Sequence, residues 1–182
     1  RGAWARPAAG AEAIREIVEA ARWVQANPNL KGDAAVAAVK DKGWDVSVKS
    51  LVAFPQILTM MSDKLEWTQK LGDAMLGQQK DVADSVQRLR ARAAAAGNLK
   101  TTSQQKVTTQ PAPSGGAAAI VIEPANPELI YVPYYNPAWA FGAWPYPAYP
   151  PYYYPPPPAY GYGTALAAGM MFGLGVAAGA AM

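Results

Sequence analysis

The chain has 182 residues, enough for one modest domain with appendages, and its charges are unevenly placed. Residues 1–100 carry 15 Lys and Arg against 11 Asp and Glu, whereas beyond Lys106 the charged residues are Glu123 and Glu128. The sequence contains no Cys and no His, which excludes thiol nucleophiles, disulfides, Cys/His zinc sites and an imidazole general base. The excess of positive charge is mild and unclustered, so we expect no nucleic-acid partner.

Apolar residues spaced three and four apart predict a mainly α fold in the charged half, with a small helical domain over residues 11–97. Asp33, Asp45 and Asp63 are suitable N-caps, and Gly97 is a suitable residue to end the last helix. The expected helices cover residues 11–26, 33–42, 45–53, 56–62, 63–76 and 81–96.

The core of this domain is expected to combine apolar stripes with tryptophans. Trp23, Trp44 and Trp67 are large enough to fill the core or its rim. The inward residues of the first expected helix are Ile14, Ile17, Val18, Ala21 and Val24, and those of the fifth are Leu65, Trp67, Thr68 and Leu71.

The composition changes after the last expected helix. Residues 98–117 are rich in Thr, Gln, Ser, Pro and Gly, which is typical of a polar linker. Residues 118–135 then contain two β-prone runs, 120–122 and 129–132, separated by Pro-containing turn residues. The pattern predicts a β-hairpin, which must dock on other parts of the protein because a lone hairpin is marginally stable in water.

Residues 136–163 are an uncharged Tyr/Pro-rich segment that we expect to be extended, with Pro155–Pro158 as polyproline II. Tyr and Trp rings on a stiff backbone are suited to stacking on sugars, on other aromatic segments or at a membrane interface. A plain spacer is the alternative. The candidate contact aromatics are Trp139, Trp144, Tyr152, Tyr153, Tyr154 and Tyr160.

Residues 164–182 form an apolar Gly/Ala-rich segment. As a helix its nineteen residues would span about 28 Å, close to the thickness of a bilayer core. We therefore predict membrane association or self-association through this segment, with disorder and packing back onto the domain as alternatives. Two GxxxG pairs supply the candidate helix-packing residues, Gly169, Gly173, Gly175 and Gly179.

No group of residues indicates catalysis. Ser103 and Lys106 have the spacing of a serine-nucleophile motif but lie in the predicted linker, without the partner motifs that such enzymes carry. The carboxylate pairs Asp41/Asp45 and Glu16/Glu19 are expected to be solvated, and Asp45 is used as a cap. We expect no catalytic residue, no metal ligand and no cofactor.

Three stretches, residues 19–76, 95–107 and 120–137, followed by the Tyr/Pro-rich run, closely resemble an uncharacterised bacterial family known as domain of unknown function 3300. The resemblance spans residues 19–182 and depends on the order of Trp, Pro and Gly, as in IVIEPANPELIYVPYYNP. It implies an exported protein of Gram-negative bacteria and brings no activity, cofactor or catalytic residue with it. Residues 1–15 depart from the family pattern, so residues 1–10 are treated as an atypical N-terminal segment.

Taken together, these features predict a non-enzymatic cell-envelope protein, in the periplasm or outer envelope, with a structural or interaction role. The aromatic segment and the apolar tail would provide contact or anchoring, and the partner would be an envelope polymer or protein. A periplasmic ligand- or glycan-binding module, with Trp44, Trp67 and Tyr131 lining a groove, is the first alternative. An uncharacterised hydrolase is the second.

Overall fold

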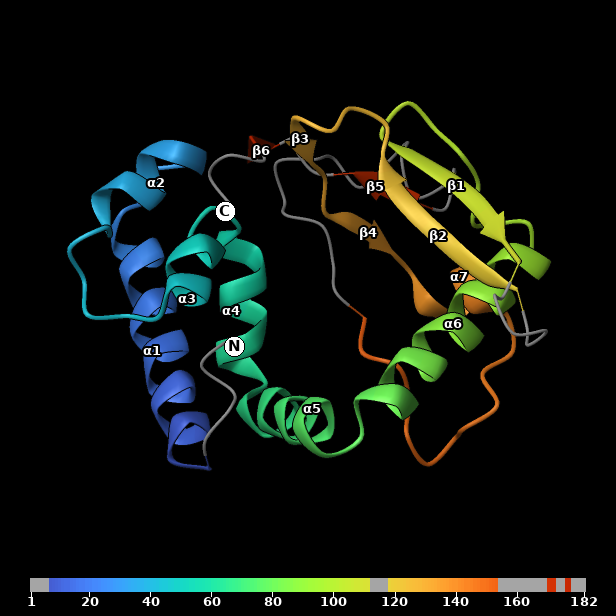
Figure 1. Cartoon of the computed structure of the whole chain (residues 1–182), viewed down its shortest axis with the longest axis horizontal. Coiled ribbons are helices and arrows are strands. Elements are labelled where there is room, and N and C mark those ends of the chain that lie inside the picture. The colour runs from blue at the N-terminus through green and yellow to red at the C-terminus, as the bar shows by residue number, and fades with distance from the viewer. Residues whose placement is uncertain (1–6, 112–117, 154–169, 173–175, 178–182) are drawn as a thin grey trace. The chain divides into compact units, whose positions relative to one another are not determined.

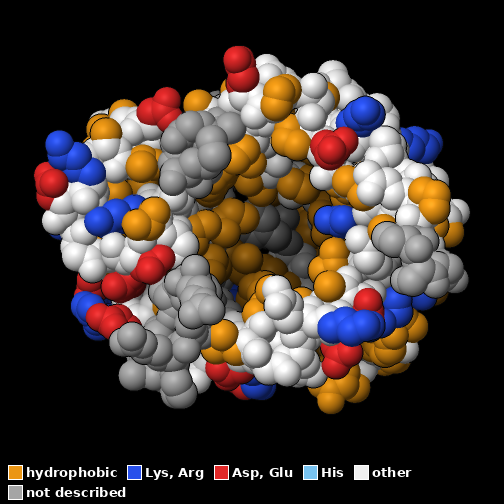
Figure 2. All heavy atoms as spheres, viewed as in Figure 1, with side chains coloured by type: hydrophobic (Ala, Val, Ile, Leu, Met, Phe, Trp, Pro, Cys, Tyr) orange, Lys and Arg blue, Asp and Glu red, His pale blue; other side chains and the backbone are white. Residues whose placement is uncertain are grey.

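The computed structural model describes residues 7–111, 118–153, 170–172 and 176–177 (Figure 1). These residues form seven helices and six short strands, which confirms the predicted mainly helical fold with a β-hairpin. Within the same ranges, no helix is both long enough and apolar enough to cross a membrane. Charged side chains of both signs are interspersed over the face shown in Figure 2.

The chain divides into two compact units, residues 1–82 with 176–182 and residues 83–175. The division falls inside the sixth helix, so most of that helix belongs to the second unit and not with the five helices before it. The helices of the first unit are α1 (Pro7–Ala26), α2 (Gly32–Ala38), α3 (Val46–Leu51), α4 (Pro55–Asp63) and α5 (Leu65–Gly77).

Prolines and their neighbours explain where several of these helices begin and end. Helices α1 and α4 both start at a proline, whose fixed φ suits the first helical position and whose missing N–H is not needed there. Helix α1 ends at Ala26, because the residue before Pro28 is disfavoured in the α region. Asn27 closes this end by donating from its side-chain amide to the Trp23 carbonyl at 2.8 Å.

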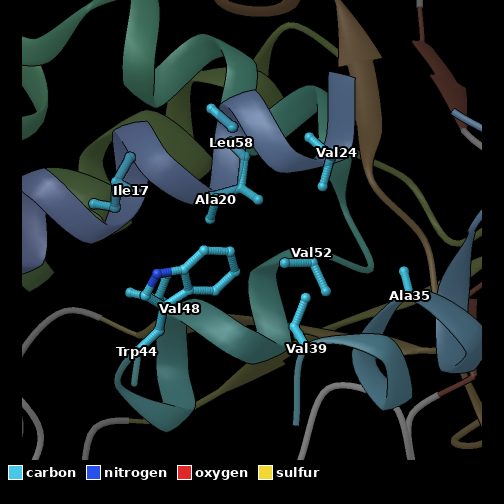
Figure 3. Close-up of a cluster of buried hydrophobic side chains, with 10 residues drawn as sticks. Ile17, Ala20, Val24, Ala35, Val39, Trp44, Val48, Val52 and Leu58 are labelled. Carbon is cyan, nitrogen blue, oxygen red and sulfur yellow. The ribbon is translucent and has the colours of Figure 1, made fainter. Parts of the chain in front are cut away.

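The core of the first unit lies between α1 and the next three helices. Figure 3 shows Ile17, Ala20 and Val24 of α1 facing the side chains of the following helices. Ile17, Val39, Val52 and Leu58 are the largest of the completely buried side chains, and the predicted stripe of α1 is confirmed at Ile17, Ala21 and Val24. Full burial of side chains of this size stabilises the unit by about 1.5–3 kcal/mol each.

The three predicted Asp caps have different outcomes. Asp45 does cap α3, because its carboxylate accepts the backbone N–H of Ser47 at 2.8 Å and the Ser47 hydroxyl at 2.6 Å. The prediction for Asp33 is wrong, since α2 begins at Gly32 and Asp33 lies in its first turn. The prediction for Asp63 is also wrong, because Asp63 is the last residue of α4 and α5 follows Lys64 without a side-chain cap.

Helix α5 departs furthest from expectation. Leu65, Trp67 and Leu71 were predicted to face the core, but all three are exposed, Trp67 at 47%. Thr68 is buried as predicted, and its hydroxyl donates to the Met61 carbonyl at 2.9 Å. The chain leaves helical geometry at Lys64 (φ −121°), so the faces of α4 are not continued into α5, and Thr68 is the residue of α5 that is buried.

The second unit contains most of α6 (Gln79–Ala95) and a β-hairpin whose strands differ from the prediction. Strand β1 (Gln105–Gln110) pairs antiparallel with β2 (Ala119–Pro124), with Val107 opposite Ile122. The predicted linker over 98–117 is therefore wrong over β1, and the partner of β2 is β1, not the run at 129–132. The remaining elements are β3 (Leu129–Ile130), β4 (Pro133–Tyr135), α7 (Pro137–Phe141) and β5 (Met170–Phe172).

Side chains of α6 fasten β2 to the helix at one residue. The Gln87 side-chain oxygen accepts the Ile120 N–H at 2.9 Å, and the Gln87 amide and the Arg90 guanidinium donate to the Ile120 carbonyl at 3.3 and 2.8 Å. Both backbone groups of Ile120 are thus used outside the β1–β2 ladder, as expected where antiparallel residues form a non-hydrogen-bonded pair. The β-hairpin docks on α6 through these bonds.

The apolar C-terminal segment is extended where the structure describes it. Strand β5 pairs antiparallel with β4, with Tyr134 opposite Met171, and the Phe172 ring contacts Tyr131 edge to face at 6.4 Å. Strand β6 (Val176–Ala177) lies against α2 in the first unit. These residues are therefore not helical, and the four candidate helix-packing glycines, Gly169, Gly173, Gly175 and Gly179, lie outside the described residues.

The Asp45 cap gives a prediction for the pH dependence of stability. Hydrogen bonds from the Ser47 hydroxyl and then its backbone N–H hold the pKa of Asp45 below its ordinary value of 3.8. A lowered folded-state pKa contributes stability above the unfolded-state pKa and loses it as pH falls through the folded-state value. Asp45→Ala should therefore cost about 1 kcal/mol of unfolding free energy at neutral pH, and less in acid below pH 3.8.

Urea unfolding followed by helical circular dichroism measures this difference across the acid range. Asp41→Ala is the matched control, because Asp41 is exposed and is not the cap of α3. A penalty for Asp45→Ala that stays constant down to strong acid would contradict the cap mechanism.

The Gln87–Ile120 pairing gives a second prediction. In Gln87→Ala the Ile120 N–H loses its acceptor, so its exchange with solvent should accelerate by about tenfold. Amide hydrogen exchange resolved at Ile120 measures the effect, and Gln69→Ala, at an exposed position on α5, should leave it unchanged. Equal protection of the Ile120 amide in both variants would show that Gln87 does not anchor β2.

Candidate functional site

Aromatic side chains after β4 form a continuous series of ring contacts. Tyr135 meets Phe141 edge to face at a centroid distance of 5.7 Å, Phe141 meets Trp144 at 5.9 Å, and Trp144 meets Tyr146 edge to face at 5.8 Å. Burial raises the pKa of the Tyr135 hydroxyl, so the inner end of the series stays uncharged. At the outer end Tyr146 is 55% exposed. The series therefore leads from the interior of the second unit to solvent.

Local backbone interactions shape the segment that carries these rings. Asn136 caps α7 by accepting the Ala138 N–H at 2.9 Å, and the helix ends at Gly142, whose φ of +65° and ψ of −149° are accessible essentially to glycine alone. The Trp144 indole N–H then donates to the Tyr149 carbonyl at 2.9 Å. This bond closes a loop that holds Tyr146 and Tyr149 beside Trp144.

Two side chains hold this loop by hydrogen bonds, Arg92 in the last turn of α6 and Asn98 just beyond the end of the helix. The Arg92 guanidinium donates to the Ala143 carbonyl, and the Asn98 amide donates to the Trp139 carbonyl at 2.7 Å. Asn98 is placed by the end of α6, where Gly97 (φ +73°) allows the N–H of Asn98 to reach the Ala93 carbonyl at 2.8 Å. Gly97 thus ends α6 as predicted. In Figure 1 the segment after α7, in orange, runs back beside α6.

A hollow of about 710 Å³ lies between α6 and this loop. Its rings come from Trp144, Tyr146 and Tyr149, of which Tyr149 is 80% exposed, and its charges come from two arginines of α6. The lining residues are Ser85, Arg88, Leu89, Ala91, Arg92, Trp144, Pro145, Tyr146 and Tyr149. This combination of flat rings, guanidinium groups and hydroxyls, without a carboxylate in the lining, can bind a ligand by stacking and by charge.

The predicted contact aromatics are distributed unequally around this hollow. Trp144 lines it, whereas Trp139 is half-buried and has its carbonyl bonded to Asn98. Tyr152 and Tyr153 follow the loop and are exposed at 47% and 38%. Tyr154 and Tyr160 lie outside the described residues.

Apart from Trp144, the residues that line the hollow were not named as candidates from the sequence, and they include all of its charges and two of its three rings. Tyr146 and Tyr149 belong to the aromatic segment already singled out, but nothing in its repetitive sequence separates them from their neighbours. Arg88 and Arg92 lie in the last helix expected from the sequence, and neither was named as a candidate for the site. Their four-residue spacing does place them on one side of α6, which was the available indication.

The groove proposed between Trp44, Trp67 and Tyr131 is not supported, because Trp44 belongs to the core of the first unit. Trp44 is 9% exposed and its indole N–H donates to Glu19 at 3.0 Å. Trp23 packs against the same core. Trp44 is therefore unavailable to a ligand.

The Glu16/Glu19 pair has a structural role. Glu16 was expected to be solvated but is 5% exposed, and its carboxylate accepts the Asp45 N–H at 2.7 Å. The hydrogen bond from Trp44, aided by Arg15, lowers the pKa of Glu19. Both carboxylates thus hold the start of α3 against α1, and neither is positioned as a general acid or base.

The other catalytic and metal candidates find no support in the described residues. Lys106 is in strand β1 and Ser103 lies in the bend before it, whereas the Ser-x-x-Lys motif requires the start of a buried helix. No group of three or more acidic side chains that could hold a metal ion occurs in the part of the chain that the structure describes.

Comparison with known proteins finds a matching family model and a relative. A family model described as "Protein of unknown function (DUF3300)" matches residues 13–182, which confirms the resemblance noted from the sequence. The "Uncharacterized protein YacH" of Escherichia coli (strain K12) is 40% identical over 187 residues. The match covers 88% of this chain and 30% of that protein, so the chain spans about a third of its relative's length. No solved structure matches.

The conformation of Gly142 gives a prediction for the loop. A Cβ at Gly142 would meet no atom within 4 Å, so Gly142→Ala adds backbone strain without a clash, of about 1–3 kcal/mol. The strain should loosen the loop and speed solvent exchange of the Trp144 indole proton, which proton NMR follows directly. Gly43→Ala, at a glycine that also has free space but no positive φ, is the control. An unchanged Trp144 exchange rate in Gly142→Ala would show that the glycine is not needed.

Proposed function

Since this chain belongs to DUF3300, a family of unknown function, we propose that it is a non-enzymatic interaction protein of the bacterial cell envelope, which binds an extended glycan in the hollow beside α6. The proposal develops the aromatic contact predicted from the sequence. Its location in the periplasm or outer envelope is supported by the uncharged composition of residues 136–182, which are rich in aromatic rings, prolines and glycines.

The observation that carries the proposal is the exposed end of the ring series. Tyr146 and Tyr149 present their rings to solvent around Trp144, and the loop that holds them is bonded to α6. Aromatic faces are suited to the apolar faces of sugar rings, and fixed rings lose little conformational entropy when a ligand binds. A hollow of about 710 Å³ falls within the size range of small-ligand sites and can hold a few sugar units of a longer chain.

The chemistry of the lining favours binding without turnover. Hydrolysis of a glycosidic bond ordinarily requires two carboxyl groups on either side of the bond. The residues that line the hollow include no Asp and no Glu, and the carboxylates of Glu16 and Glu19 in the first unit are engaged in holding α3. A bound glycan would therefore be held and not cut.

The proposed function predicts that sugar binding depends on the rings. In isothermal titration of the full chain with soluble hexasaccharides, both neutral N-acetylglucosamine and acidic galacturonate hexamers, at least one class should bind. Trp144→Ala and Tyr149→Ala should each weaken that binding by about tenfold, because a stacked ring contributes on the order of 1 kcal/mol.

Trp67→Ala is the matched control, since Trp67 is an exposed tryptophan on α5 in the first unit. Tyr149→Ala removes an 80% exposed side chain, so it should not disturb folding even where Trp144→Ala does. Absence of binding to both hexamers, or binding that survives both ring substitutions unchanged, would overturn the proposal.

A further inference from the structure

We propose that the glycan held in the hollow is acidic, and that a carboxylate on its sugar ring pairs with Arg88 while the ring stacks on the exposed tyrosines. The inference rests on the proposed function and adds the charge and the pairing residue. It starts from the asymmetry of the lining, which holds two arginines and no acidic side chain.

The two arginines of the hollow have different roles. Arg92 donates to the Ala143 carbonyl, and its Nε is buried, so its guanidinium is committed to the fold of the loop. Arg88 is exposed, and its hydrogen bond is to the Ser85 hydroxyl at 2.5 Å. Arg88 is therefore the positive group that is both in the hollow and accessible to a ligand.

The geometry of a guanidinium group favours a carboxylate. It offers five N–H donors in a planar fork, of which the Ser85 hydroxyl takes one, and the rest include a pair that matches the two oxygens of a carboxylate. The Ser85 bond also limits the positions that the Arg88 side chain adopts, which lowers the entropy lost on binding. One accessible guanidinium balances the single charge of a carboxylate better than the nearly double charge of a phosphate monoester.

The tyrosine rings and the Arg88 charge together favour a ligand that is both a sugar and an acid. Tyr146 and Tyr149 offer faces to a pyranose ring, and Arg88 lines the same hollow one helical turn before Arg92. A uronic acid carries its carboxylate directly on the pyranose, so a single residue of the polymer satisfies both contacts. A neutral sugar would stack equally well and leave the Arg88 charge without a partner.

The test compares two ligands that differ only in charge. Hexagalacturonate and its fully methyl-esterified form are titrated into the full chain by calorimetry at low salt. The acid should bind about tenfold more tightly or more, because a charge-assisted pair is replaced by a neutral contact in the ester. In Arg88→Gln the acid and the ester should bind with nearly equal affinity, and the affinity for the ester should stay at the wild-type value.

Arg22→Gln, at an exposed arginine of α1, is the control for the loss of one positive charge, and it should keep the wild-type preference. If the wild-type chain binds the ester as tightly as the acid, and this binding is still weakened by Tyr149→Ala, the inference is overturned and the proposed function stands. If the preference for the acid survives in Arg88→Gln, the assignment of Arg88 is overturned. If neither the acid nor the ester binds the wild-type chain, the inference is overturned, and the proposed function falls with it only if the N-acetylglucosamine hexamer does not bind either.

Discussion

Hydrogen bonds from long side chains of α6 to distant backbone groups hold the second unit together. Gln87 and Arg90 bind the backbone of Ile120, and Arg92 and Asn98 donate to carbonyls near α7. The segments they bind are almost uncharged and interrupted by prolines that lack an N–H, so these segments are short of donors of their own. The fixed loop, and with it the hollow, depends on donors supplied by the helix.

In the first unit the helix supplies hydrogen-bond acceptors instead of donors. Glu16 and Glu19 of α1 accept N–H groups at Asp45 and Trp44, twenty-five or more residues away, and so fix the start of α3. In both units charged side chains of one helix satisfy groups of a segment that is far away in sequence. This explains why the charge of the chain is concentrated in helices even where its partners are neutral. These four charged side chains, Glu16, Glu19, Arg90 and Arg92, have structural roles, and Arg88 is the arginine of the hollow that is exposed to a ligand.

Local features of the sequence predicted the helices and the Asp45 cap, because breakers and caps act over a few residues. The sequence did not predict which face of α5 is buried or which strand pairs with β2, because both depend on how elements that are distant in the sequence pack together. Leu65, Trp67 and Leu71 have a helical spacing like that of the core residues of α1, yet all three are exposed, and the chain breaks helical geometry at Lys64 just before them. β1 was hidden by its polar composition, although Val107 and its two following threonines are β-branched. Trp144 could be named as a contact residue, whereas the hollow required the fold that brings it beside Arg88.

The hydrogen bonds at the N–H and C=O of Ile120 affect how readily β2 could pair with a strand of another chain. A strand at the border of a sheet normally offers unpaired N–H and C=O groups to any other extended chain, and segments rich in Ile, Val and Tyr without charge are prone to such growth into fibrils. At Ile120 both groups are taken by Gln87 and Arg90, so this residue is not available to pair with an incoming strand. Helix α6 thereby opposes edge-to-edge growth at one end of the Ile- and Val-rich strand of the hairpin.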